Sequence, residues 1–187
     1  SYRDEGEGDP IVFIHGIPTS SLLWRNIIPG IKSLGRCLAL DLVGMGDSSK
    51  PDIQYTIEEH IAYFEQWVSL MKLSSMVLVM HGWGSVIGFE YAKRHPSKIK
   101  GMAFYEGHVK ASHEWTQLSL PVQEWVSKLH DKNMDELIYN EHFLVETFLP
   151  EGVCGGLSKT IHDAYRKPYL RKEDRRVLRQ YMEDLPV

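Results

Sequence analysis

The sequence predicts an α/β protein with a mostly parallel sheet flanked by helices, followed by a helical cap. Short, nearly continuous apolar runs recur up to residue 106, and such runs are typical of parallel strands buried on both faces. Stretches of helical character separate them, as in strand–helix–strand units. Beyond residue 106 the pattern becomes mostly helical, with no further clear strand. We therefore expect a core over 1–106 and a helical cap over 107–187.

Each element of the expected core has its own signal. The four apolar runs that predict strands are Ile11–Ile14, Cys37–Leu40, Met76–Met80 and Gly101–Tyr105. The expected helices are Ser21–Leu34, Ile57–Met71 and Gly84–His95. The second helix has the clearest start, because Thr56 can act as N-cap and Glu59 stands at the matching capping-box position. Basic residues fill the last turn of the third helix and Pro96 follows it, which indicates its end.

Composition excludes several classes of protein. The chain has 187 residues, the size of one domain, and a net charge of -4. This balance gives no electrostatic case for binding nucleic acid or an anionic membrane. A late group of basic residues is interrupted by Glu173 and Asp174, so we expect a solvated helix face rather than a binding patch. The basic residues are Arg171, Lys172, Arg175, Arg176 and Arg179.

Cysteine content and hydropathy favour a protein of a reducing compartment, such as the cytoplasm. Only Cys37 and Cys154 are present, too few for a disulfide framework. No apolar run is long enough to span a bilayer, and no signal-peptide pattern opens the chain. The chain begins at Ser1 rather than Met, so a preceding segment stays open. No metal-ligand spacing and no phosphate-binding loop occur, so we expect neither a metal nor a cofactor.

Polar or glycine-rich turns follow three of the predicted strands, at His15–Pro18, His81–Gly84 and Glu106–His108. Ligands of open α/β sheets bind beyond the carboxyl ends of strands, so these turns predict the site. Residues 81–85 have the pattern of a nucleophile elbow, a sharp strand-to-helix turn that needs small neighbours. The backbone N–H groups of Ile17 and Trp83 could form an oxyanion hole or halide cradle, assisted by the helix dipole.

Five segments of the chain share their residue patterns with one known family. They are His15–Ser21, Leu23–Pro29, Asp41–Ser48, Val77–Ser85 and Phe143–Pro150. Together they resemble the haloalkane dehalogenase family of the α/β-hydrolases. The coelenterazine-oxidising luciferases of the same group match nearly as well. The resemblance implies an α/β-hydrolase core with a helical cap. It also implies a reaction in which an Asp attacks the halogen-bearing carbon and a His-activated water hydrolyses the resulting ester. It assigns Trp83 as the halide-binding indole and Glu106 as the acid that orients the His.

Three departures from the family pattern affect this chemistry. Gly82 stands at the nucleophile position and has no side chain, so it cannot form the ester. Ser85 is no substitute, because an elbow centred there would need small residues at Trp83 and Ile87. Ile17 replaces a halide-binding Asn of many members. Finally, the chain stops at Val187, before the family's catalytic His and last two core strands. We therefore expect an open edge on the last predicted strand, available for self-association.

None of the nine histidines stands where the base is expected. His15 and His81 match turn positions of the family and are predicted to be structural. His60 and His95 fall in helices, with no partner visible in the sequence. Those of the cap region are predicted to be solvated: His108, His113, His130, His142 and His162. The same region has four aromatic anchors, at Trp115, Trp125, Phe143 and Phe148.

Three functions remain open at this point. The chain could be a dehalogenase-family hydrolase, as a fragment, variant or diverged copy. It could be a non-catalytic relative that binds a small apolar molecule under the cap. It could also be a luciferase-like oxygenase that needs no cofactor. In each case the expected partner is a small apolar or halogenated molecule rather than nucleic acid or a membrane.

Overall fold

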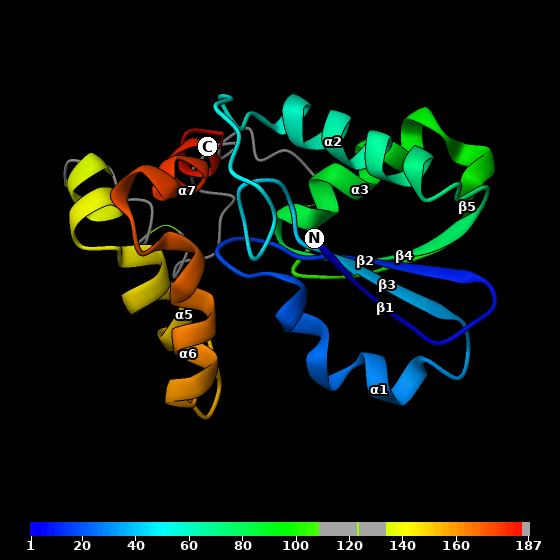
Figure 1. The fold of residues 1–187 in the computed structure, drawn as a ribbon, viewed down its shortest axis with the longest axis horizontal. Helices are drawn as coiled ribbons and strands as arrows, with labels where there is room; N and C mark the ends of the chain where they lie inside the picture. Colours follow the sequence, from blue (N-terminus) through cyan, green and yellow to red (C-terminus); the bar gives the residue numbers. More distant parts are fainter. Residues whose placement is uncertain (109–122, 124–133, 185–187) are drawn as a thin grey trace. The chain divides into compact units, whose positions relative to one another are not determined.

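The structure, a computed structural model, describes residues 1–108, 123 and 134–184 (Figure 1). The chain divides into two compact units, Ser1–Val109 and Lys110–Val187, which are described separately below. The predicted domain assignment, 1–106 and 107–187, stays a prediction. The predictions for His113, Trp115, Trp125 and His130 concern residues outside the described ones.

Unit 1 contains a five-stranded sheet in the order β1-β3-β2-β4-β5. Its strands are β1 (Tyr2–Glu5), β2 (Pro10–Ile14), β3 (Arg36–Leu40), β4 (Met76–His81) and β5 (Ile99–Tyr105). β1 runs antiparallel to β3, whereas every other neighbouring pair is parallel. The predicted mostly parallel sheet is therefore confirmed, and all four predicted strands are present.

Helices cover both faces of the sheet in unit 1 (Figure 1). One face carries α2 (Ile57–Leu70) and α3 (Trp83–Arg94), and the other carries η1 (Ser21–Asn26) and α1 (Ile28–Ile31). A short turn of helix, η2 (Pro96–Lys98), leads into β5. The capping box of α2 forms as predicted, with the Thr56 Oγ1 accepting from the Glu59 N–H at 3.3 Å and the Glu59 carboxylate accepting from the Thr56 N–H at 2.9 Å.

Two elements of unit 1 differ from the sequence prediction. β1 was not predicted, because three of its four residues are charged and it has no apolar run. As an edge strand it needs little apolar surface. The single helix expected over Ser21–Leu34 is instead η1 followed by α1. Pro29 has no N–H to donate within a continuous helix, and its fixed φ suits the start of a new one.

Each face of the sheet has a packed aromatic pair in its core layer. On the α2–α3 face, the rings of Phe64 and Tyr91 meet edge to face at 5.0 Å, and both side chains are fully buried. On the opposite face, the rings of Phe13 and Trp24 lie 5.2 Å apart. Buried aromatic pairs of this kind contribute both apolar area and favourable ring geometry. The Phe64–Tyr91 pair joins α2 to α3, and the Phe13–Trp24 pair joins β2 to η1.

The two edges of the sheet differ in chemistry. At the β1 edge, Asp4 pairs with Arg36 at 2.6 Å and Glu5 pairs with Lys32 at 3.0 Å. At the β5 edge, Met102, Phe104 and Tyr105 are 48%, 50% and 70% exposed. Charged residues discourage another strand from pairing with an edge, whereas apolar residues do not. Apart from Lys100, which pairs with Asp9 at 2.8 Å, the β5 edge presents apolar side chains and is the less protected of the two in unit 1.

The described residues of unit 2 form helices joined by turns and contain no strand. Its elements are η4 (Glu136–Asn140), η5 (Leu144–Phe148), α5 (Leu149–Glu151), α6 (Lys159–Arg166), η6 (Lys167–Tyr169), η7 (Lys172–Arg175) and α7 (Arg176–Glu183). A bidentate ion pair joins α6 to η5, with Arg166 Nε and Nη2 at 2.5 and 2.7 Å from the two carboxylate oxygens of Glu146. Such forked pairs are geometrically specific.

The late basic residues are not the uniformly solvated face that was predicted. Arg175 donates to the carbonyl oxygens of Tyr139 and Tyr169 at 2.6 and 2.9 Å. Arg179 pairs with Asp135 and Glu183, both at 2.7 Å. These guanidinium groups satisfy carbonyls and carboxylates inside unit 2. Their spacing along the helix could not reveal this, because the acceptors lie up to 44 residues away.

Two further histidine predictions were wrong. His142 is buried rather than solvated, and His162 is mostly buried, with its Nε2 at 2.8 Å from the Val145 carbonyl oxygen. His95, for which no partner was visible, has its Nε2 at 3.1 Å from Glu65. His60 is buried beside the ring of Tyr55, at 6.3 Å between ring centroids. These partners all lie earlier in the chain than the histidines they contact, on another element or in the loop before α2.

Candidate functional site

The turn between β4 and α3 is sharp and centres on Gly82. This residue is the N-cap of α3, with φ 51° and ψ -127°. Residues with a side chain rarely adopt that backbone conformation, whereas glycine adopts it without steric cost. A Cβ built on Gly82 would have a single neighbour within 4 Å, the Gly16 Cα at 3.8 Å. The position therefore has space for a side chain, although its backbone conformation strains any residue but glycine.

Around Gly82 the strand and helix backbones lie almost in contact. A Cβ on Gly84 would lie 2.5 Å from the Ile14 carbonyl oxygen and 2.6 Å from that of His15. A Cβ on Gly16 would lie 3.2 Å from the Trp83 nitrogen. The predicted need for small residues around this turn is therefore met. The structure also brings the turn after β2, which includes Ile17, against the turn that includes Trp83.

Glu106 lies directly after β5 and beside the same turn. Its carboxylate is 3.1 Å from Nε2 of His81, and the Gly82 N–H donates to the Tyr105 carbonyl oxygen at 3.2 Å. Glu106 has φ 51°, in the left-handed region. His81 was predicted to be structural, and its pairing with Glu106 was not predicted. The pair depends on the register of β4 and β5, which end with His81 opposite Tyr105.

Trp83 is buried, and its indole ring lies 5.4 Å from the imidazole of His108. It begins α3 immediately after Gly82. Trp83, Gly82 and Glu106 therefore lie on two neighbouring turns, and Ile17 lies on the third. The structure brings the four predicted site residues to one end of the sheet, while the role of each stays a prediction.

His15 is structural, as predicted. Its Nε2 accepts from the Leu42 N–H at 3.0 Å, so its Nδ1 carries the proton and donates to the Gly16 carbonyl oxygen at 2.8 Å. The ring is completely buried, and burial lowers its pKa, which favours the neutral form. With both nitrogens engaged, His15 holds the turns after β2 and β3 together.

Asp41 is also structural, although a buried carboxylate after a strand could suggest chemistry. It accepts from the N–H groups of Ser21 and Asp47 at 2.7 and 3.0 Å. Burial alone would raise the pKa of this carboxyl group, but these hydrogen bonds outweigh it and the pKa is lowered. The ionised group therefore fixes two loops near β3.

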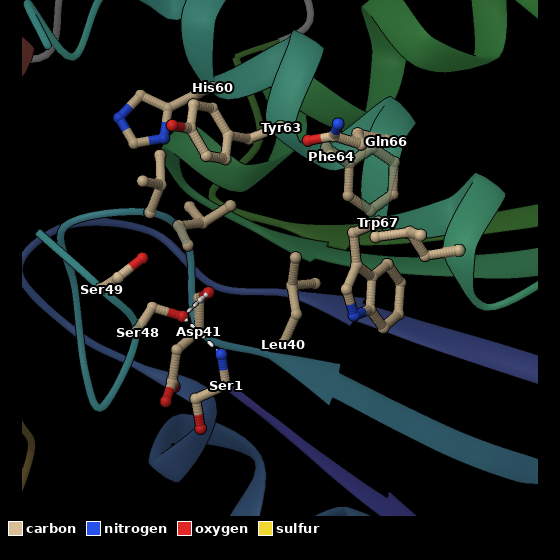
Figure 2. A pocket seen from close by; sticks show the side chains of 13 residues that line it. Ser1, Leu40, Asp41, Ser48, Ser49, His60, Tyr63, Phe64, Gln66 and Trp67 are labelled. Carbon is tan, nitrogen blue, oxygen red and sulfur yellow. Dashed lines mark hydrogen bonds between the residues drawn. The ribbon is translucent and has the colours of Figure 1, made fainter. Parts of the chain in front are cut away.

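A pocket of about 210 Å³ lies elsewhere in unit 1, between α2 and the end of β3 (Figure 2). Its wall is largely apolar, with Leu40, Phe64 and Trp67 among the lining residues. Ser48 is engaged at one side, donating to the Asp41 carbonyl oxygen at 2.7 Å and accepting from the Ser1 amine at 2.8 Å. The lining includes none of the four predicted site residues. We therefore place the candidate site at the β4–α3 turn and not in this pocket.

Among residues 1–108, 123 and 134–184, no group of three or more His, Cys, Asp or Glu side chains is arranged to hold a metal ion. Within the same residues, no helix is both long and apolar enough to cross a membrane. The two cysteines are free thiols, Cys37 buried and Cys154 exposed.

Comparison with known proteins sets the class of this fold. Residues 9–152 match the family model described as the alpha/beta hydrolase fold. The chain is 40% identical over 193 residues to a haloalkane dehalogenase of Sphingobium indicum, and 36% identical to one of Mycolicibacterium smegmatis. These matches cover the whole chain but only 65% and 62% of the two relatives.

Solved structures lead to the same family. The ancestral haloalkane dehalogenase AncHLD2 superposes with a TM-score of 0.95 at 32% identity, covering all of this chain and 67% of that one. The haloalkane dehalogenase DbeA from Bradyrhizobium elkani gives a TM-score of 0.94 at 31% identity, covering all of this chain and 65% of that one. The chain therefore belongs to the haloalkane dehalogenase family of the α/β-hydrolases.

Proposed function

We propose that this chain carries the haloalkane dehalogenase site without its nucleophile, and that the 187-residue polypeptide does not hydrolyse carbon–halogen bonds. The observation that supports this proposal most is the glycine at position 82. It stands between β4 and α3 with φ 51°, has open space where a side chain would project, and is followed by buried Trp83. In this proposal the turn is a nucleophile elbow, and the ester cannot form because no carboxylate is present at its centre.

The remaining groups keep the roles that the family resemblance assigns. Trp83 would bind halide through its indole and backbone N–H, Ile17 would contribute a second backbone donor, and Glu106 would be the acid. The expected ligand is a small apolar or halogenated molecule. The chain spans about 65% of the length of its Sphingobium relative. Any statement about the activity or ligands of the whole protein is therefore a proposal too.

The same observations give different support to two alternative functions. A non-catalytic relative that binds a small apolar molecule agrees with glycine at position 82. A luciferase-like oxygenase is less well supported, because the relatives and structures compared above are all called haloalkane dehalogenases.

Halide release tests the proposal. Purified chain is incubated with 1-bromobutane and, separately, 1-iodobutane, and bromide or iodide is measured against a protein-free blank. We expect no release above the blank, because loss of a nucleophile removes several orders of magnitude of rate. Release of many halide ions per chain would show that the reaction does not need a side chain at position 82.

A further inference from the structure

Ser85 joins the two turns that make up the candidate site. It is completely buried in the first turn of α3. Its hydroxyl donates to the Gly82 carbonyl oxygen at 2.7 Å and accepts from the His108 N–H at 2.8 Å. One side chain therefore connects the β4–α3 turn to the segment that follows β5. A buried hydroxyl with both functions used is held in one orientation.

The segment that Ser85 holds carries a strained residue. Glu106 has φ 51° although it has a Cβ, and such conformations persist only where surrounding contacts over-determine them. The next residue, Gly107, lies close enough that a Cβ on it would be 3.4 Å from the Ser85 Cβ. Ser85 thus lies beside the chain just beyond the strained residue, and its hydroxyl binds the backbone at His108, two residues after Glu106.

Three hydrogen bonds connect the turns, and they surround Glu106 on both sides. The Gly82 N–H donates to the Tyr105 carbonyl oxygen at 3.2 Å, before Glu106, and the Ser85 hydroxyl binds His108 at 2.8 Å, after it. The Glu106 carboxylate itself lies 3.1 Å from His81 Nε2. Because the Glu106 side chain is 63% exposed, packing does little to fix it, which leaves its contact with His81 and the backbone anchors on either side.

We propose that Ser85 is a positioning residue, which fixes the Glu106 carboxylate against His81 by holding the backbone on the far side of Glu106. The inference rests on the proposed function, in which Glu106 is the acid of the site. If the Ser85 hydroxyl only accepted the His108 N–H, its removal would leave the Glu106–His81 pair unchanged. If it positions Glu106, its removal will disturb that pair.

The test is Ser85→Ala, followed by nuclear magnetic resonance at constant pH. We expect exchange of the His108 amide hydrogen to accelerate about tenfold, as expected for the loss of one hydrogen bond. We also expect the His81 Nε2 resonance to move toward its position in Glu106→Gln, in which the carboxylate is absent. A folded Ser85→Ala chain whose His81 resonance stays unchanged would overturn the proposal.

Ser20→Ala is the matched control. Ser20 is also buried, and its hydroxyl accepts one backbone N–H, that of Leu22 at 3.3 Å, at the start of η1. We expect this variant to accelerate exchange at Leu22 alone, with His108 and His81 unchanged. A shift of the His81 resonance in Ser20→Ala as large as in Ser85→Ala would attribute the effect to general loosening and overturn the proposal.

Glu106→Gln keeps the proposal testable if Ser85→Ala does not fold. Because Ser85 binds the His108 backbone independently of the carboxylate, we expect the His108 amide to stay as protected as in the unchanged chain. Loss of that protection would mean that the side-chain pair holds the segment and Ser85 does not. None of these readouts involves a haloalkane, so they can fail or succeed independently of the proposed function.

Discussion

Alanine substitutions at three glycines separate backbone strain from steric overlap at the β4–α3 turn. Gly82→Ala adds a Cβ with ample space but at φ 51°, so its cost is torsional, about 1–3 kcal/mol. Gly84→Ala adds a Cβ only 2.5 and 2.6 Å from two carbonyl oxygens of the sheet, which can be relieved only by moving α3. We expect Gly84→Ala to lower the free energy of unfolding more than Gly82→Ala.

Gly30→Ala in α1 is the control, because its φ lies outside the left-handed region and nothing lies within 4 Å of the added Cβ. Replacing a helical glycine at such a site stabilises by about 0.4–1 kcal/mol. Urea unfolding followed by circular dichroism measures all three variants. If Gly82→Ala proved as stable as Gly30→Ala, the claim that the turn is strained would be wrong. If Gly84→Ala lowered the free energy of unfolding less than Gly82→Ala, the claim of close contact between α3 and the sheet would be wrong.

Two further predictions concern stability and association. Burial lowers the pKa of His60 to about 3 and that of His142 to about 4, from 6.5, so the unfolded chain binds protons that the folded chain does not. The free energy of unfolding should therefore fall as the pH drops below 6.5, by about 2 kcal/mol per histidine between pH 7 and 5, and His142→Gln should flatten this fall in urea titrations. The exposed β5 edge should cause self-association, which sedimentation velocity measures and which Met102→Lys should reduce. Leu70→Lys, at a site 75% exposed on α2, is the control and should not reduce it. A chain that stays monomeric at all concentrations would contradict this prediction.

The fold was predictable where the sequence pattern has a local cause. The parallel strands can be recognised as apolar runs because both faces of the sheet are covered, and α2 begins at its predicted capping box. β1 was not predictable in this way, because an edge strand of charged residues, stabilised by pairs such as Asp4–Arg36, has no periodic signal. The break between η1 and α1 was readable from Pro29 but was outweighed by the surrounding apolar residues.

The candidate site was predicted as a set of positions, whose roles stay predictions, but the contacts between its residues were not predicted. The family resemblance placed residues 17, 82, 83 and 106, and the structure brings their turns together. It could not show that Glu106 pairs with His81, or that Ser85 binds His108, because these contacts depend on the register between β4 and β5. Similarly, burial of His142 depends on packing within unit 2, and no local sequence pattern around residue 142 predicts it.

Alkylation of Gly82→Asp tests the assignment of the elbow most directly. The variant is incubated with 1-bromobutane and examined by intact-mass spectrometry, with Gly82→Asn as the uncharged control and circular dichroism to establish folding. The Asp carboxylate should displace bromide, form an ester and add one butyl group that maps to residue 82, while Gly82→Asn stays unmodified. We expect the ester to persist, since the resemblance assigns its hydrolysis to a histidine with no counterpart at a matching position in these 187 residues. A folded Gly82→Asp chain without the adduct would mean that residue 82 is not the nucleophile position.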